Sequence, residues 1–234
     1  MTQNDSIQVA GAIPAPAQAF PLVRHLSCRL SRLLVRTAIT PNQVTGLSLL
    51  SGLACAACFA FGGYAVQVLG ALLLTVSYTL DNCDGEIARV KGLSSEFGAK
   101  FDDMVDWMVD AAFFLGLGYG VWKTNGMAVW FWFGAAAAAG AFIDYVIDLY
   151  KYRQDAKKED ARSREEEATD PKKPEDVTDW LIYIFHKLSR ADFCLIILVL
   201  ALLNVTWILL PFAAIGAQVY WITDLFDRAR GWHT

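Results

Sequence analysis

Asp81-Asn82-Cys83-Asp84-Gly85-Glu86-Ile87-Ala88-Arg89 is the stretch that decides the fold, together with Gly98, Asp102 and Asp106 further along the chain. Asp81 and Asp84 are three residues apart, and Asp102 and Asp106 are four apart, so on helices each pair projects from one face. Two such faces, brought together, form an oxygen-rich site for a hard divalent cation such as Mg²⁺. The spacing therefore predicts two helices that meet at a metal site.

The residues around this stretch are those of a membrane protein. The chain has 234 residues, of which 55% are hydrophobic and 13% aromatic, and its mean hydropathy is +0.35. These values are too apolar for an ordinary soluble domain and predict one polytopic membrane domain. The formal net charge of -4 gives no indication of a nucleic-acid partner. Five cysteines, an odd number, are interpreted as small packing residues.

Runs of about 20 apolar residues can cross a bilayer, and the chain has six candidates. We place them at about 43–63, 67–90, 98–122, 127–150, 191–209 and 210–228. The predicted fold class is an all-α integral membrane protein with six transmembrane helices. Because charges inside a bilayer are rare and usually functional, the acidic stretch at the end of the second span is a candidate site by itself.

The segments outside the spans have distinct characters. Residues 1–19 are expected to be a disordered tail and not a signal peptide, because no basic segment leads into an apolar core. Residues 20–39 alternate leucines with arginines and predict an amphipathic helix in the membrane interface. A helix-start signal, Thr40-Pro41-Asn42, then begins the main domain, 40–228. Residues 151–179 carry charges of both signs and predict a solvated cytoplasmic loop with some helix.

The distribution of basic residues predicts the orientation. Lysines and arginines are concentrated before the first span, between the second and third, in 151–190 and after the sixth, whereas the opposite connections hold Lys123 alone. The positive-inside rule then puts both termini and the acidic stretch on the cytoplasmic side. We expect a multi-pass protein, of the bacterial inner membrane, with a cytoplasm-facing site.

The residues among the aspartates point to phosphate chemistry. Gly85 and Gly98 leave room for a ligand to approach the backbone, and Arg89 offers a planar donor fork that suits phosphate. Carboxylates, a divalent metal and an arginine around one pocket are the groups that phosphoryl transfer needs.

At these residues the chain resembles the CDP-alcohol phosphotransferase family, whose signature is D-x2-D-G-x2-A-R-x7-8-G-x3-D-x3-D. The fixed positions are filled by Asp81, Asp84, Gly85, Ala88, Arg89, Gly98, Asp102 and Asp106. Thr40-Pro41-Asn42-Gln43-Val44-Thr45 also resembles the segment with which the family begins its first span. The resemblance covers about residues 20–225 and is most specific over 40–110.

The resemblance implies roles for individual residues. Asp81, Asp84, Asp102 and Asp106 would bind two ions, Mg²⁺ or Mn²⁺, and Asp106 would also be the general base. The CDP donor would be contacted by Asn42, Gln43, Val44, Thr45, Gly85, Arg89 and Ser95. A homodimer is expected from the resemblance alone.

Within the family, residues 83–99 resemble phosphatidylinositol-phosphate synthases and di-inositol phosphate synthases. Those relatives often have arginine directly after the last aspartate, where this chain has Trp107. The resemblance therefore does not identify the acceptor alcohol. Lys100, Arg153 and Arg190 are candidate partners for a phosphorylated acceptor, with Arg190 equally interpretable as a positive-inside anchor.

Other acidic residues of the third and fourth spans have ordinary structural interpretations. Asp110 continues the row of Asp102 and Asp106, and we expect it to contact a small residue or a tyrosine, with a proton relay or a hydrogen-bond anchor as the alternative. Asp103 points off that row and is expected to be solvated or paired with a lysine. Asp144 and Asp148 are expected to pair with Lys151 or Arg153 just beyond the fourth span, and a role in the acceptor pocket is the alternative.

The favoured hypothesis is a membrane enzyme that transfers a substituted phosphate group from a CDP-alcohol, most simply CDP-diacylglycerol, to a small polar alcohol, with release of CMP. An alternative within the class uses a CDP-amino alcohol as donor and diacylglycerol as acceptor. A divalent-cation transporter explains the aspartates but gives no task to Gly85, Ala88 and Arg89.

Overall fold

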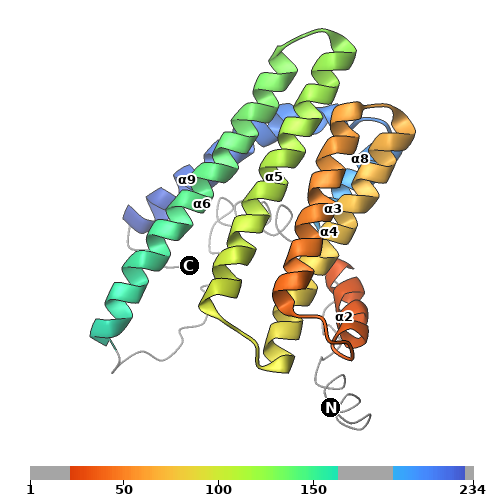
Figure 1. The fold of residues 1–234 in the computed structure, drawn as a ribbon. Coiled ribbons are helices and arrows are strands. Elements are labelled where there is room, and N and C mark those ends of the chain that lie inside the picture. The colour runs from red at the N-terminus through yellow and green to blue at the C-terminus, as the bar shows by residue number, and fades with distance from the viewer. Residues whose placement is uncertain (1–21, 163–191, 230–234) are drawn as a thin grey trace.

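The computed structural model describes residues 22–162 and 192–229, and within these ranges every regular element is a helix. The helices are α2 (Leu22–Leu34), α3 (Pro41–Phe61), α4 (Tyr64–Lys91), α5 (Glu96–Asn125), α6 (Val129–Arg162), α8 (Phe193–Leu202), the short η1 (Thr206–Ile208) and α9 (Leu209–Ala229). Short turns make α3, α4, α5 and α6 run in alternating directions (Figure 1). The start of α3, the end of α4 and the start of α5 therefore meet at one end of the bundle.

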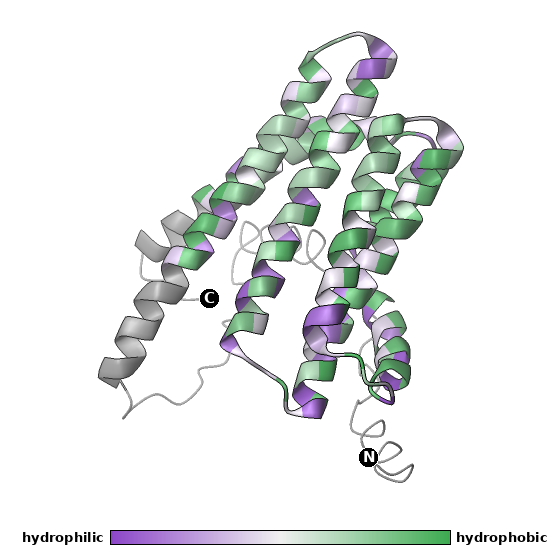
Figure 2. Ribbon diagram, in the orientation of Figure 1, coloured by the Kyte–Doolittle hydropathy of each residue, from purple (hydrophilic) through white to green (hydrophobic). Residues whose placement is uncertain are grey.

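The first four predicted spans are confirmed as helices. Among the described residues, α3, α4, α5 and the part of α6 from Val129 to Tyr150 are long and apolar enough to cross a membrane. Their middle portions are predominantly hydrophobic, and polar residues collect near the helix ends around the acidic stretch (Figure 2). The helix α6 continues to Arg162, into the segment predicted to be a charged loop with some helix.

The fifth predicted span, 191–209, is shorter than expected. Helix α8 ends at Leu202 because Asn204 adopts a left-handed backbone with φ of 58°, after which η1 leads into α9. Asparagine tolerates this conformation better than most residues. Helix α9 corresponds to the sixth predicted span, but the count of six transmembrane helices stays a prediction.

Helices α3 and α5 each begin with a cap formed by side chains close to the helix start. Gln43 Oε1 accepts from the Thr40 amide at 3.0 Å, and Pro41 occupies the first turn of α3, where its missing N–H costs nothing. Ser95 Oγ accepts from the Gly98 amide at 3.0 Å and so begins α5. The predicted helix start at 40–42 is confirmed.

Small residues bring α3 and α5 into backbone contact. A Cβ atom added to Gly116 would collide with the carbonyl oxygen of Ala56, and one added to Gly120 with that of Phe59. Beside this contact the rings of Phe59 and Phe113 meet edge to face, with centroids 5.1 Å apart. Close packing through glycine is typical of transmembrane helices.

The first helix, α2, packs against α4 at the end of the bundle that holds the acidic stretch (Figure 1). Its first turn is capped from a distance, because the Asp192 carboxylate accepts from the amides of Leu22 and Val23, both at 3.1 Å. Leu26 and Leu33 are exposed on its outer side. A position in the membrane interface suits this exposure and stays a prediction.

Between α2 and α4 lies a buried polar contact. The Cys28 thiol donates to Glu86 Oε1 at 3.3 Å, and both residues are buried. Burial, followed by this carboxylate, raises the pKa of Cys28, so the thiol stays protonated and able to donate. Cys55, Cys83 and Cys194 are also free and buried, as expected for packing residues.

Candidate active site

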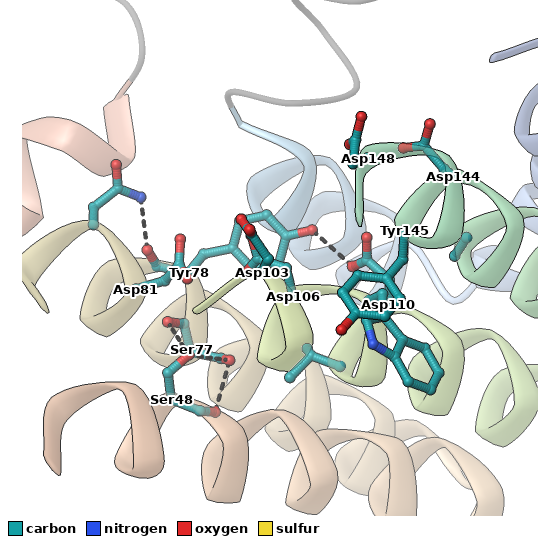
Figure 3. Close-up of a pocket in the computed structure, with 14 residues that line it drawn as sticks. Ser48, Ser77, Tyr78, Asp81, Asp103, Asp106, Asp110, Asp144, Tyr145 and Asp148 are labelled. Carbon is teal, nitrogen blue, oxygen red and sulfur yellow. Dashed lines mark hydrogen bonds between the residues drawn. The ribbon is translucent and has the colours of Figure 1, made fainter. Parts of the chain in front are cut away.

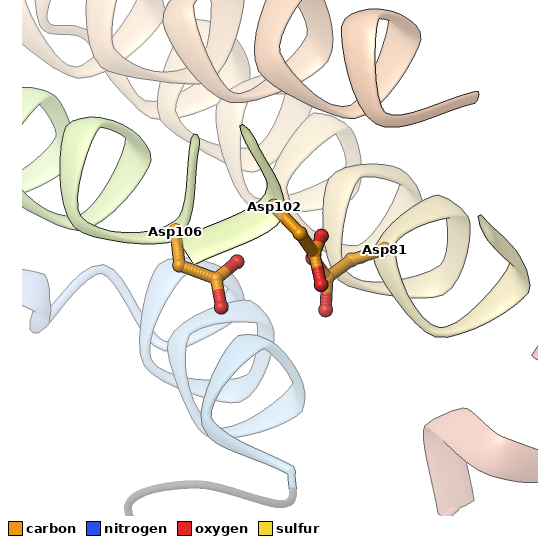
Figure 4. Close-up of side chains that lie close together, drawn as sticks. All are labelled: Asp81, Asp102 and Asp106. Carbon is orange, nitrogen blue, oxygen red and sulfur yellow. The ribbon is translucent and has the colours of Figure 1, made fainter. Parts of the chain in front are cut away.

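Three aspartates of the signature converge where α4 and α5 face each other. Asp81 comes from α4, and Asp102 and Asp106 from α5, and one carboxylate oxygen of each lies within 4.8 Å of those of the others (Figure 4). The two-helix arrangement predicted from the spacing is confirmed for these three residues. We call them the carboxylate group.

The carboxylate group fits a divalent cation. Asp81 Oδ1 and Asp102 Oδ1 are buried and have no hydrogen-bond partner within the described part of the chain. Negative oxygens this close together repel one another, and burial increases the cost of leaving them unpaired. A hard cation would satisfy both needs, since Mg²⁺ and Mn²⁺ prefer carboxylate oxygen.

The fourth predicted ligand, Asp84, lies beside this group and is not one of its three members. Its side chain is buried, and one carboxylate oxygen accepts from the hydroxyl of Thr45 on α3. The same hydroxyl is 3.2 Å from the Pro41 carbonyl oxygen. Thr45 therefore ties the first turn of α3 to the signature on α4.

Two cavities are lined by the signature aspartates. The larger cavity, of about 410 Å³, is lined by Asp81 and Asp106. The smaller cavity, of about 190 Å³, is lined by Asp84 and Asp102. Each cavity is thus lined by two of the signature aspartates and is large enough to hold part of a ligand.

The smaller cavity collects most of the residues predicted to contact the donor. Those that line it are Asn42, Thr45, Gly85, Arg89 and Ser95. Gln43 instead caps α3, and Val44 is buried in the core between α2 and α4. Gly98 keeps the cavity open, since a Cβ atom there would lie 3.1 Å from Ser95 Oγ and 3.2 Å from Asn42 Oδ1.

Sequence reasoning missed several lining residues of the smaller cavity. Leu93, Ser94 and Ala99 belong to the turn and first helical residues between the two halves of the signature. The signal that could have found them is their position, because a turn between two ligand-bearing helices has to border the site that they form.

The larger cavity is lined by polar residues from α3, α4, α5 and α6. Tyr78 Oη donates to Asp110 Oδ1 at 3.1 Å, which confirms the tyrosine contact expected for Asp110 (Figure 3). Ser48 on α3 and Ser77 on α4 each donate to the other's carbonyl oxygen, at 2.9 and 2.8 Å. Ser77 and Tyr78 lie one helical turn before Asp81, a spacing that could have revealed them.

The far wall of the larger cavity is formed by α5 and α6. It contains Asp103, Trp107, Asp144, Tyr145 and Asp148. Asp103 is exposed, as expected. The basic side chains expected to pair with Asp144 and Asp148 lie beyond residue 150, outside the described side chains.

The residues predicted to hold a phosphorylated acceptor are not brought into either cavity by the described part of the chain. Lys100 is exposed and forms an ion pair with Glu96 at 2.6 Å, one turn earlier on α5. The side chain of Arg153 and all of Arg190 lie outside the described residues. The roles of these three toward the acceptor stay predictions.

Comparisons with known proteins agree with this geometry. The family model of the CDP-alcohol phosphatidyltransferases matches residues 38–219. The chain is 34% identical to a bifunctional IPC transferase and DIPP synthase of Aquifex aeolicus over 137 residues, which are 58% of this chain and 30% of that protein. It is 33% identical to an archaetidylinositol phosphate synthase of Pyrococcus horikoshii over 100 residues, 43% of this chain and 52% of that protein.

The matched region contains both cavities and all the signature aspartates. The chain spans about half the length or less of the relatives that it matches. Because the family model covers most of the sequence, this chain belongs to the CDP-alcohol phosphatidyltransferase family and is an integral membrane protein.

Proposed function

We propose that this protein transfers a phosphatidyl group from CDP-diacylglycerol to the hydroxyl of a small polar alcohol and releases CMP. The observation that carries the proposal is that the signature aspartates, three of which lie close together, line both the smaller and the larger cavity. A reaction between two substrates needs two binding spaces that meet at the reacting atoms.

The smaller cavity suits the nucleotide side of the donor. Arg89 supplies a permanent positive charge, and Gly85 and Gly98 leave the backbone open to a phosphate group. Asn42, Thr45 and Ser95 add polar contacts around it. The acyl chains of the lipid would stay in the bilayer beside the apolar helix faces.

Asp81, Asp84, Asp102 and Asp106 are the residues that would hold two Mg²⁺ or Mn²⁺ ions. When bound, such ions neutralise phosphate oxygens as charge moves during phosphoryl transfer.

Asp106 is the proposed general base, because it is exposed and lines the larger cavity, from which the alcohol would approach. The alcohol oxygen forms a bond to the β-phosphorus of the donor. The bond between that phosphorus and the oxygen of CMP breaks, and the proton of the hydroxyl passes to the Asp106 carboxylate. The products are a phosphodiester lipid and CMP.

The direct test measures CMP released from CDP-diacylglycerol by the purified full chain in nanodiscs, with a mixture of small alcohols. We expect release that depends on the alcohol, stops with EDTA and returns with Mg²⁺ or Mn²⁺. Release only with a CDP-amino alcohol and diacylglycerol would support the reversed assignment of the lipid. Metal flux across vesicles without any CMP release would contradict the whole proposal.

A further inference from the structure

Glu86 is a buried acidic residue of the signature stretch that lines neither cavity. It directly follows Gly85, yet its side chain is only 8% exposed and is not among the lining residues of the two cavities. One carboxylate oxygen accepts from the Cys28 thiol of α2 at 3.3 Å, and the other is buried with no hydrogen-bond partner among the described residues. A buried carboxyl group with so few hydrogen bonds costs free energy. Since an apolar side chain would pack α2 against α4 at lower cost, packing alone does not account for Glu86.

The side of α2 that meets Glu86 is polar for a buried surface. Its buried residues include Ser27, Cys28 and Ser31, each no more than 4% exposed. The Ser27 carbonyl oxygen accepts from the Cys83 thiol of α4 at 3.5 Å, so a second polar contact lies one helical turn from the first. Hydrogen bonds depend on angle, whereas apolar contacts are not directional. These two contacts therefore fix how α4 is rotated against α2.

The turn of α4 that carries the signature is held from two sides. Asp84 accepts from the Thr45 hydroxyl of α3. Glu86 accepts from the Cys28 thiol of α2. Residues two apart on an α-helix point about 200° away from each other, so α3 and α2 contact opposite sides of the same turn. Between these two residues lies Gly85, which lines the smaller cavity together with Asp84. A rotation of this turn would move both of them relative to the cavity.

We propose that Glu86 is a positioning residue of the donor and metal site, and that its hydrogen bond with Cys28 holds α4 in the rotation that turns Asp84 toward the smaller cavity. Residues that orient a metal ligand without touching the metal commonly change metal affinity when they are replaced. The proposal rests on the proposed function for the identity of the donor and for Asp84 as a metal ligand. It makes α2 a support of the signature and gives Cys28 a task beyond packing.

The first test uses Glu86→Leu, which fills a similar volume and removes the acceptor oxygens. The full chain in nanodiscs is titrated with Mn²⁺, followed by EPR, and with CDP-diacylglycerol in the presence of Mg²⁺, followed by calorimetry. We expect both Kd values to rise about fivefold or more, because the hydrogen bond that orients the turn is lost. The apparent Tm should stay the same or rise, since an apolar side chain replaces a buried carboxyl group. Glu86→Gln keeps an accepting oxygen and should bind both within about twofold of the wild-type protein.

The second test changes the hydrogen-bond donor. Cys28→Ala removes the thiol and should weaken binding of Mn²⁺ and CDP-diacylglycerol as Glu86→Leu does. Cys28→Ser keeps an O–H donor and should restore most of the binding. Cys55→Ala is the matched control, because Cys55 is an equally buried cysteine of the core on α3 and is not among the lining residues of either cavity. It should lower the apparent Tm without changing either Kd.

The outcomes separate the positioning role from the proposed function. Unchanged Kd values for Mn²⁺ and CDP-diacylglycerol in Glu86→Leu would overturn the positioning role and leave its bond with Cys28 as a packing contact. Equal weakening in Cys55→Ala would also overturn it, since the loss of any buried thiol would then have the same effect. Absence of CMP release by the wild-type chain with every alcohol would contradict the proposed function instead, and the Mn²⁺ titration would still decide the role of Glu86. The test stands even where Cys28→Ala folds poorly, because Glu86→Leu removes the same bond.

Discussion

At the scale of single residues, the four signature aspartates do not share one environment. Asp84 is 4% exposed and accepts a hydrogen bond from Thr45, whereas Asp106 is exposed and lines the larger cavity. Residues in different surroundings can carry out different tasks with the same chemical group. The aspartates should therefore differ in the step that each one supports.

We predict that Asp106→Asn lowers kcat about 10²- to 10⁴-fold, because the base is lost, while binding of CDP-diacylglycerol changes little. Asp84→Asn should lose metal and donor binding together, since its buried oxygen belongs to the donor side. Calorimetry of donor binding in the presence of Mg²⁺ measures both variants. Glu96→Gln, an exposed change on α5, is the control, and equal loss of binding in Asp106→Asn and Asp84→Asn would refute the division of roles.

At the scale of elements, the turn between α2 and α3 is held by the end of α4. Lys91 Nζ donates to the carbonyl oxygens of Thr37 at 2.8 Å and Ile39 at 2.7 Å. The next residues, from Thr40 to Thr45, lead into the wall of the smaller cavity. The ammonium group of Lys91 thus positions the first turn of α3 against the signature.

We predict that Lys91→Met raises the KM for CDP-diacylglycerol about tenfold, because the loss of charged hydrogen bonds costs about 1.5–3 kcal/mol and frees this turn. The KM for the alcohol should stay unchanged, and Lys91→Arg should restore much of the donor KM. Steady-state kinetics on the two variants and on Lys123→Met, at the other end of the bundle, make the comparison. A parallel rise in both KM values would mean a general structural effect.

The contact between α3 and α5 is also an element-scale feature. Gly116→Val should lower the apparent Tm in detergent by several degrees, because its side chain would separate two backbones that touch at Ala56. Gly46→Ala is the matched control, since nothing lies within 4 Å of a Cβ atom added there. An unchanged Tm for Gly116→Val would show that the helices can move apart without cost.

At the scale of the whole molecule, the alternating helices bring the end of α4 and the start of α5, which carry the signature, to one end of the bundle (Figure 1). In the proposed reaction, a water-soluble alcohol would arrive from one aqueous side and the lipid donor from the bilayer. This arrangement needs a fixed orientation in the membrane, which the positive-inside rule predicts as cytoplasmic for the site.

We predict that Ser94→Cys, beside the signature, reacts with a membrane-impermeant maleimide only after bacterial cells are broken open. Asn125→Cys, in the opposite turn, should react in intact cells. Gel shifts on the two variants measure this. Labelling of Ser94→Cys in intact cells would reverse the predicted orientation.

The predicted homodimer is tested by the mass of the protein in nanodiscs and in detergent. A dimer in both would support the prediction, and a monomer in both would contradict it. The exposed apolar side chains on α3 and α4, such as Leu50 and Leu69, could face lipid or a second copy.

Much of the fold and part of the site followed from local pattern alone. Hydrophobic length predicted the first four long helices, and the i, i+4 spacing of Asp102 and Asp106 predicted a shared face, because both depend only on helical geometry within one segment. The helix start at Thr40 also followed from its own residues. The fifth span was too long, because a single left-handed residue, Asn204, ends α8 early.

The contacts between distant segments were decided by the tertiary structure. The sequence by itself determined which residues carry the chemistry, since the signature needs only correct types at correct spacing. The packing of the helices decided that Trp107 meets Tyr145, that Asp84 is not one of the three residues of the carboxylate group and that Gln43 and Val44 do not line the smaller cavity. These outcomes depend on the rotation of each helix about its axis. That rotation is fixed by close contacts at glycines and by core side chains that are far apart in the sequence.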